Sequence, residues 1–170
     1  MAPDIFIDDF EITENTEELH AILGRSIIIA TRFDNLCDHT AKFIDIKQSF
    51  VSLSESDEFD YYVNKLFNNF TNLNNNIRSL PLGQPGKVIL HNARIARNEI
   101  AHSLTIGLTG CLDAKIDESN FKAKISDLVS KVAVGDYLIS TLLSILNNDP
   151  LPIYSESHYS QKIIDWVQGQ

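Results

Sequence analysis

Apolar residues recur every three to four positions along most of this chain, and that spacing is typical of amphipathic helices. No stretch shows the strict alternation of a half-buried strand. The pattern predicts helices over residues 14 to about 50, 57–80, 117–148 and 160–167, and a further helix from the turn at 81–86 to about Ser103. The first of these has room for a break near 38–40. An all-α fold follows, with four or five helices packed as a bundle.

The same pattern suggests how the chain is organised. Residues 1–13 are predicted to form an N-terminal arm, 14–148 a helical bundle, and 149–170 a tail with a short helix. Residues 105–113 contain two glycines and are expected to form a loop. Gly135, inside the last long helix, marks either a kink or a close approach of two helices. Seven asparagines between 64 and 76 form either a solvated face or an amide surface for RNA.

Composition and charge narrow the classes of function. The chain has 170 residues, of which 44% are hydrophobic, and a net charge of −9, which argues against a general polyanion binder. Two cysteines are too few for a disulfide framework. No signal peptide is apparent and the apolar runs are too short to span a bilayer, so we expect a cytoplasmic protein that does not associate with a membrane. Between residues 78 and 102 the chain has four basic residues and one acidic residue, a balance that allows a small positively charged site.

Candidate chemistry concentrates in the third predicted helix. Its apolar stripe is expected to comprise Ile89, Ala93, Ala96 and Ile100, which recur at steps of four, three and four. On the opposite face, similar steps align a polar set, with Arg97 on the flank between the two faces: His91, Arg94, Asn98 and His102. A helix that packs through small alanines does not need so many polar groups. This helix is therefore the candidate site.

The residue types in this helix suit RNA cleavage without a metal. Histidine exchanges protons near neutral pH and can act on a ribose 2′-OH, while arginine stabilises charge on the phosphate. Asn98 would bind a phosphate oxygen or orient His102. Arg97 and His102 are five residues apart, which rotates them by about 140° on one helix. They converge only if the helix frays at His102, or if two copies of the helix meet across a two-fold axis.

The stretch Arg97-Asn98-Glu99-Ile100-Ala101-His102 is similar to the Arg-polar-x3-His signature of HEPN domains. The resemblance covers about residues 14–148 in the order of helices, although only the six-residue motif is specific. It implies catalytic roles for Arg97 and His102, an accessory role for Asn98, and an active site at a homodimer interface. It also implies a toxin or phage-defence nuclease with RNA as substrate and an antitoxin or other defence protein as partner. Leu104 stands where one toxin subgroup has a tyrosine.

Four further residues are expected to bind substrate: Lys87, His91, Arg94 and Glu99. Glu99 could reach Arg97 only from a partner chain, or could be a plain surface acid. No cofactor and no metal are expected, because His91 and His102 lie about 16 Å apart along one helix. The alternative is a catalytically silent HEPN-like module that binds a protein partner or a nucleotide. An unrelated helical adaptor is a further alternative.

Overall fold

The computed structural model describes residues 16–49, 56–69, 72–104 and 117–170. The predicted N-terminal arm and the glycine-containing loop lie outside these residues. Within them the chain forms helices and no strand, which confirms the all-α prediction. The helices are α1 Thr16–Ser49, α2 Ser56–Asn69, α3 Leu73–Ser79, α4 Gln84–His102, α5 Glu118–Asn147 and α6 Glu156–Gln168.

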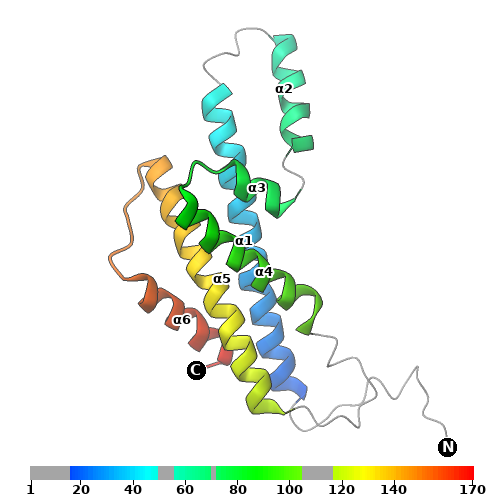
Figure 1. Cartoon of the computed structure of the whole chain (residues 1–170), viewed down its shortest axis with the longest axis vertical. Helices are drawn as coiled ribbons and strands as arrows, with labels where there is room; N and C mark the ends of the chain where they lie inside the picture. The colour runs from blue at the N-terminus through cyan, green and yellow to red at the C-terminus, as the bar shows by residue number, and fades with distance from the viewer. Residues whose placement is uncertain (1–15, 50–55, 70–71, 105–116) are drawn as a thin grey trace, which may run out of the picture.

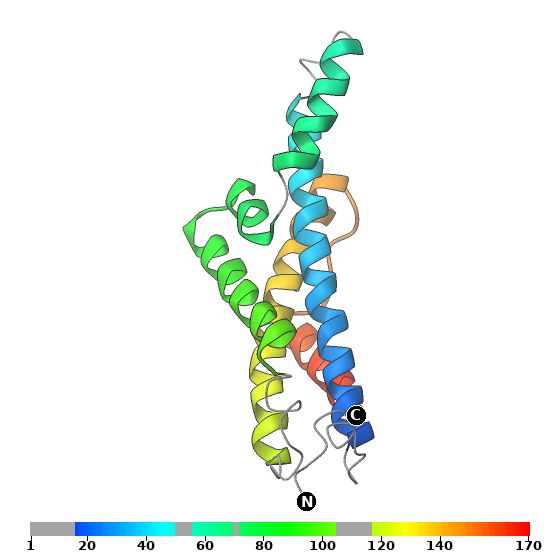
Figure 2. The same ribbon diagram turned by 90° about the vertical axis from the view of Figure 1, so that its right-hand side faces the viewer.

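Helix α5 lies at the centre of the bundle and packs against α4, α1 and α6 (Figure 1). Helices α1, α3 and α4 also contact one another, and α3 and α4 lie on the same side of α1 (Figure 2). Helix α2 stands apart, beside the C-terminal half of α1, as both views show. The fold therefore leaves α3 and the outer side of α4 on one face of the molecule.

The core lies where α1, α4 and α5 meet, and each contributes fully buried side chains, among them Phe33, Ile100 and Ile125. Gly135 of α5 permits a close approach there. A β-carbon at this position would lie 2.4 Å from the β-carbon of Ala93 and 3.0 Å from Cε2 of Phe33. Of the two roles that the sequence suggested for Gly135, the structure supports the close approach.

Replacing Gly135 by alanine is expected to destabilise the fold by about 1–3 kcal/mol, because the added methyl group overpacks the contact between α4 and α5. Gly24→Ala on α1 is the matched control, since a β-carbon there meets no atom within 4 Å. Alanine favours a helix over glycine, so the control should be neutral or stabilising by up to about 1 kcal/mol. Urea unfolding followed by circular dichroism measures both. Equal effects at the two positions would contradict this packing.

Helix α1 runs without the break for which the sequence left room at 38–40. Thr40 is fully buried, so this part of α1 packs against the bundle, while His39 is exposed. Lys42 forms an ion pair with Asp38, one turn earlier, at 2.8 Å. Such pairs with the acid on the N-terminal side stabilise a helix.

The single helix predicted over 57–80 is divided into α2 and α3, so the described residues form six helices rather than four or five. Asn72 caps α3: its side chain accepts a hydrogen bond from the backbone N–H of Asn75 at 2.9 Å. Asparagine favours such caps over helix interiors, which explains the division.

A buried carboxylate ties three helices together. Asp136 of α5 is fully buried, and Arg32 of α1 lies 3.1 Å from its Oδ1 and donates to its Oδ2 at 3.3 Å. Tyr159 of α6 donates its hydroxyl to Oδ2 at 2.5 Å. Burial and this hydrogen bond raise the pKa of Tyr159, so its hydroxyl stays protonated as the donor. Helix α6 thus packs onto the bundle, with Val167 fully buried.

Helix α5 is long and apolar enough to cross a membrane by length and composition alone. The core helix of a water-soluble bundle meets the same criterion. In this structure eight residues of α5 are buried, and the helix packs against α1, α4 and α6.

Candidate functional site

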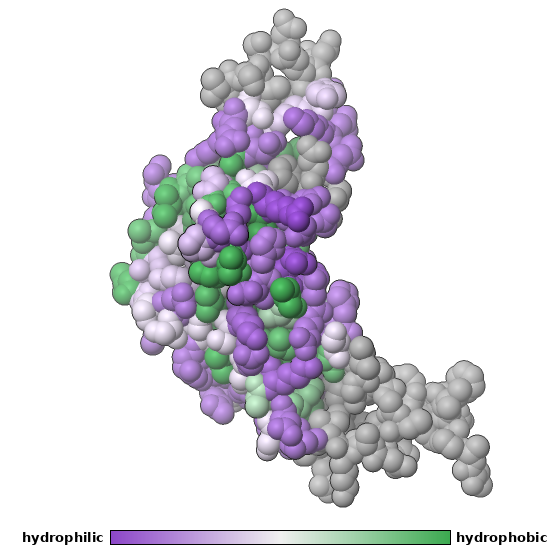
Figure 3. Space-filling model, in the orientation of Figure 1, coloured by the Kyte–Doolittle hydropathy of each residue, from purple (hydrophilic) through white to green (hydrophobic). Residues whose placement is uncertain are grey.

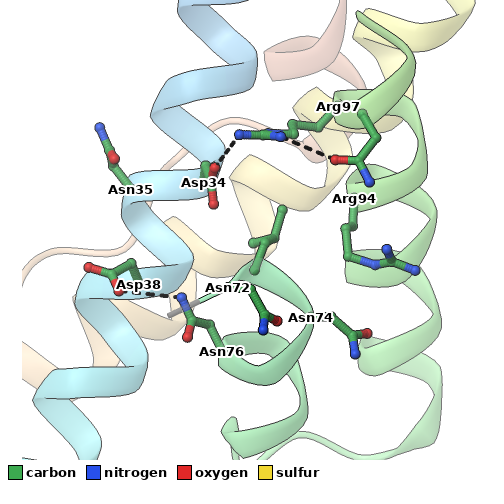
Figure 4. Close-up of a pocket in the computed structure, with 10 residues that line it drawn as sticks. Asp34, Asn35, Asp38, Asn72, Asn74, Asn76, Arg94 and Arg97 are labelled. Carbon is green, nitrogen blue, oxygen red and sulfur yellow. Dashed lines mark hydrogen bonds and ion pairs between the residues drawn. The ribbon is translucent and has the colours of Figure 1, made fainter. Parts of the chain in front are cut away.

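A polar pocket of about 450 Å³ opens between α1, α3 and α4 (Figure 4). Hydrophilic residues dominate the face that carries α3 and α4, with apolar residues in separate patches (Figure 3). Charged and amide side chains line most of the pocket. They are Asp34, Asn35 and Asp38 of α1, Asn72, Asn74 and Asn76 in and beside α3, and Arg94, Arg97 and Asn98 of α4.

Helix α4 presents these side chains because its opposite face enters the core. Its buried residues are Leu90, Ala93, Ala96 and Ile100. The predicted stripe therefore holds at three positions, whereas Ile89 is only partly buried and Leu90 takes its place. The helix is turned slightly from the predicted orientation. Arg97 consequently faces the space between α4 and α1 rather than open solvent.

Arg97 is held by two neighbours. Its Nη2 lies 2.5 Å from Oδ2 of Asp34 on α1, and its Nη1 donates to Oδ1 of Asn98 at 3.1 Å. The side chains of Arg97 and Asp34 are 25% and 29% exposed, so solvent screens this ion pair only in part. Nε of Arg97 is buried without a partner. The guanidinium is therefore fixed at the pocket, and its buried Nε–H donor is unused.

Arg94 lies one turn before Asn98 and also lines the pocket. Within the part of the chain that the structure describes, Arg94 makes no hydrogen bond or ion pair, and its Nε is buried. His91 lies nearby; burial lowers its pKa, and the positive charges of Arg94, Arg78 and Lys87 lower it further. Lys87 itself donates to the backbone oxygen of Arg78 at 3.0 Å. This end of α4 is thus electropositive.

The wall opposite the arginines is acidic and amide-rich. Asn76 is 2% exposed, and its Nδ2 donates to Oδ1 of Asp38 at 3.3 Å. Its Oδ1 is buried without a partner. Of the seven asparagines that the sequence placed on one solvated or RNA-binding face, Asn76 is thus buried, whereas Asn68 and Asn75 are exposed.

His102 is the last residue of α4, is exposed, and does not line the pocket. The helix does not fray before it, because the backbone N–H of Ser103 still bonds to the carbonyl of Glu99 at 2.9 Å. Arg97 and His102 therefore keep the offset of about 140° that a regular helix imposes. The structure thus shows no fraying that would bring them together, and the route through a partner chain stays a prediction.

Exposed apolar residues share one line on α4 with His102. Val88 is 47% exposed and Ile95 is 57% exposed. Steps of seven residues return to within about 20° of the same direction on a helix, so Val88, Ile95 and His102 are aligned. This set, the outer stripe of α4, has no partner helix among the described residues.

Glu99 pairs with Lys124 of α5 in its own chain at 2.7 Å. It holds α4 against α5 and does not contact Arg97. Asp34 instead is the acid that positions Arg97, and sequence reasoning did not identify it. Asp34 and Asp38 are one turn apart on α1, a spacing that would have marked a polar face within an otherwise apolar helix.

Within the described ranges, no three histidine, cysteine, aspartate or glutamate side chains come together as a metal site requires. Comparisons of the chain with protein-family models, with curated proteins and with solved structures found no match.

Proposed function

We propose that the chain is a metal-independent endoribonuclease of HEPN type, acting in the cytoplasm as a toxin or phage-defence effector. One observation carries the proposal: Asp34 and Asn98 fix Arg97 at a polar pocket, while His102 stands exposed one turn after Asn98. An arginine held in place can stabilise a phosphate without reorganising, and an exposed histidine can reach substrate. The bundle of long helices around this motif agrees with the HEPN resemblance.

The proposed reaction is an internal transfer of the phosphate. The ribose 2′-oxygen attacks phosphorus, and the bond from phosphorus to the 5′-oxygen breaks. His102 accepts the 2′-OH proton, and its protonated form donates a proton to the leaving 5′-oxygen. Arg97 stabilises the charge on the non-bridging oxygens. The products are a 2′,3′-cyclic phosphate and a 5′-hydroxyl.

A second copy of the chain completes the proposed site. The outer stripe of α4 ends at His102, so a two-fold contact through this stripe would bring two motif helices together. Arg97 lies about 160° around α4 from Ile95, so the stripe alone does not bring it to the interface. The proposed site therefore requires that the exposed end of α4, with His102, reaches the mouth of the polar pocket of the partner, where Arg97 lies. The stripe offers two apolar anchors, Val88 and Ile95, for this contact.

The proposal is tested with purified chain and structured RNA in the presence of excess EDTA. We expect cleavage under these conditions, with cyclic phosphate and 5′-hydroxyl ends identified by end-group analysis. Expression in a bacterial host should arrest growth. Intact RNA after prolonged incubation with concentrated dimer, or cleavage that needs a divalent metal and leaves 3′-hydroxyl ends, would refute the proposal.

Ile95→Asp is expected to abolish dimer formation and to reduce cleavage to the level of the monomer, because it buries a charge in the proposed contact. Ile145→Asp is the matched control, since Ile145 on α5 is 56% exposed and lies outside the stripe. Sedimentation equilibrium and the RNA assay measure the two effects. Circular dichroism verifies that both variants are folded. A dimeric, active Ile95→Asp variant would rule out this interface.

The second candidate is a catalytically silent module of the same fold that binds a protein partner or a nucleotide. The ion pair between Arg97 and Asp34 favours this candidate, because a guanidinium that is already paired with a carboxylate can have a purely structural role. In that case the chain would bind its ligand with intact RNA remaining in the assay. The His102→Ala variant would then behave as the wild type.

A further inference from the structure

Three residues that line the polar pocket each have a buried hydrogen-bonding atom without a partner. Oδ1 of Asn76 is an acceptor without a partner, and Nε of Arg94 and Nε of Arg97 are donors without partners. Nearly all buried polar atoms in folded proteins have a partner, so three in one pocket point to a ligand. Asn76 is 2% exposed, so its Oδ1 is the atom of the three that most needs a hydrogen-bond partner.

The charges of the pocket select the kind of ligand. Arg97 is already paired with Asp34, whereas Asp38 of α1 and Arg94 of α4 lie on opposite sides of the pocket (Figure 4). Between these two residues a phosphate would be repelled by Asp38, and a cation would be repelled by Arg94. A neutral group with donors and acceptors on one edge fits both walls. The volume of about 450 Å³ lies within the range of about 300–1,000 Å³ that small ligands occupy.

We infer that this pocket binds one unpaired RNA base that carries an exocyclic amino group: adenine, cytosine or guanine. The amino group donates to Oδ1 of Asn76 and to the carboxylate of Asp38, which has lone pairs left beyond its bonds to Asn76 and Lys42. Arg94 donates to the acceptor beside the amino group. Uracil has no amino group and satisfies these atoms less well.

This inference rests on the proposed function, because the base would belong to the nucleotide whose phosphate Arg97 contacts. Asn98 lines the pocket and lies one helical turn before His102. A strand with its base in the pocket therefore passes the catalytic motif. Such a site restricts cleavage to loops and single strands, in which bases are free to leave the stack.

The test measures binding in the His102→Ala full-length chain, which is not expected to cleave its ligand. Fluorescein-labelled oligoadenylate, oligocytidylate and oligouridylate of equal length are titrated by anisotropy. We expect at least one amino-bearing oligomer to bind at least about fivefold tighter than oligouridylate, the difference made by about one hydrogen bond. Two substitutions, Asn76→Leu and Asp38→Asn, should remove this preference.

Matched controls separate recognition from charge and folding. Asp127→Asn also removes the acid of an i,i+4 pair with lysine, but on α5, and Asn75→Ala removes an exposed asparagine of α3. Both should keep the preference. Equal binding of all three oligomers, no binding, or a preference that survives Asp38→Asn would overturn the inference. Preferential binding by a wild-type chain that leaves RNA intact would instead refute the nuclease and retain the base pocket.

Discussion

Replacing His102 by alanine is expected to lower the rate of RNA cleavage by at least about 100-fold, the usual contribution of a general acid–base residue. The expected effect is chemical, because His102 is exposed at the end of α4 and supports no buried contact. Stability should change by no more than about 0.5 kcal/mol, as for other surface positions. Initial rates on a labelled RNA hairpin and a thermal unfolding curve measure the two quantities.

The matched control is His158→Ala, since His158 is an exposed histidine on α6. It should leave cleavage and growth arrest unchanged. His102→Ala should in contrast be harmless on expression. Equal cleavage rates for the wild type and His102→Ala would exclude the proposed mechanism, whatever RNA is used.

A substitution at Arg97 tests catalysis less directly than one at His102, because it also changes stability. Removal of Arg97 leaves Asp34 partly buried without the guanidinium, so Arg97→Ala would lower stability together with activity. Asp34→Asn separates the two roles. It keeps an oxygen that can accept from Arg97 but removes the charge, and so tests positioning of the guanidinium. If the chain is a nuclease, Asp34→Asn stays folded and its rate of RNA cleavage falls. If the chain is a catalytically silent module, neither the wild type nor this variant cleaves RNA.

Much of α4 could be predicted from the sequence because its pattern is local. Ala93, Ala96 and Ile100 follow the helical period, so their burial needs no knowledge of other elements. The mistake at Ile89 and Leu90 has the same origin. The hydrophobic period does not distinguish two orientations of the helix that differ by one residue. Packing against α1 and α5 decides which of two adjacent apolar residues enters the core.

The pocket could not be predicted in this way, because its walls come from distant parts of the chain. Asp34 and Arg97 are 63 positions apart, and no local pattern says which polar residue of α1 faces α4. Asp136 presents the same difficulty, since hydrophobic periodicity does not anticipate a fully buried acid. Asn72 gave a usable signal: a cap-forming residue inside a predicted helix can mark the start of a new one.

A heterodimer of Arg97→Ala and His102→Ala chains is expected to regain about half of the wild-type rate, although each homodimer is inactive. The reason is the regular geometry of α4 up to His102, which keeps Arg97 and His102 of one chain on different sides of the helix. If Arg97 of one protomer works with His102 of its partner, the heterodimer keeps one intact pair out of two. Any pair within one chain is lost.

Co-expression with two affinity tags and tandem purification isolate this heterodimer. The control carries both substitutions on one chain beside a wild-type partner, which destroys both pairs between chains but keeps the pair within the wild-type chain. Activity of the first heterodimer and not of the second requires catalysis across the interface. The reverse result would place both residues of a working pair on one chain, and the exposed end of α4 would then have to move for His102 to meet Arg97.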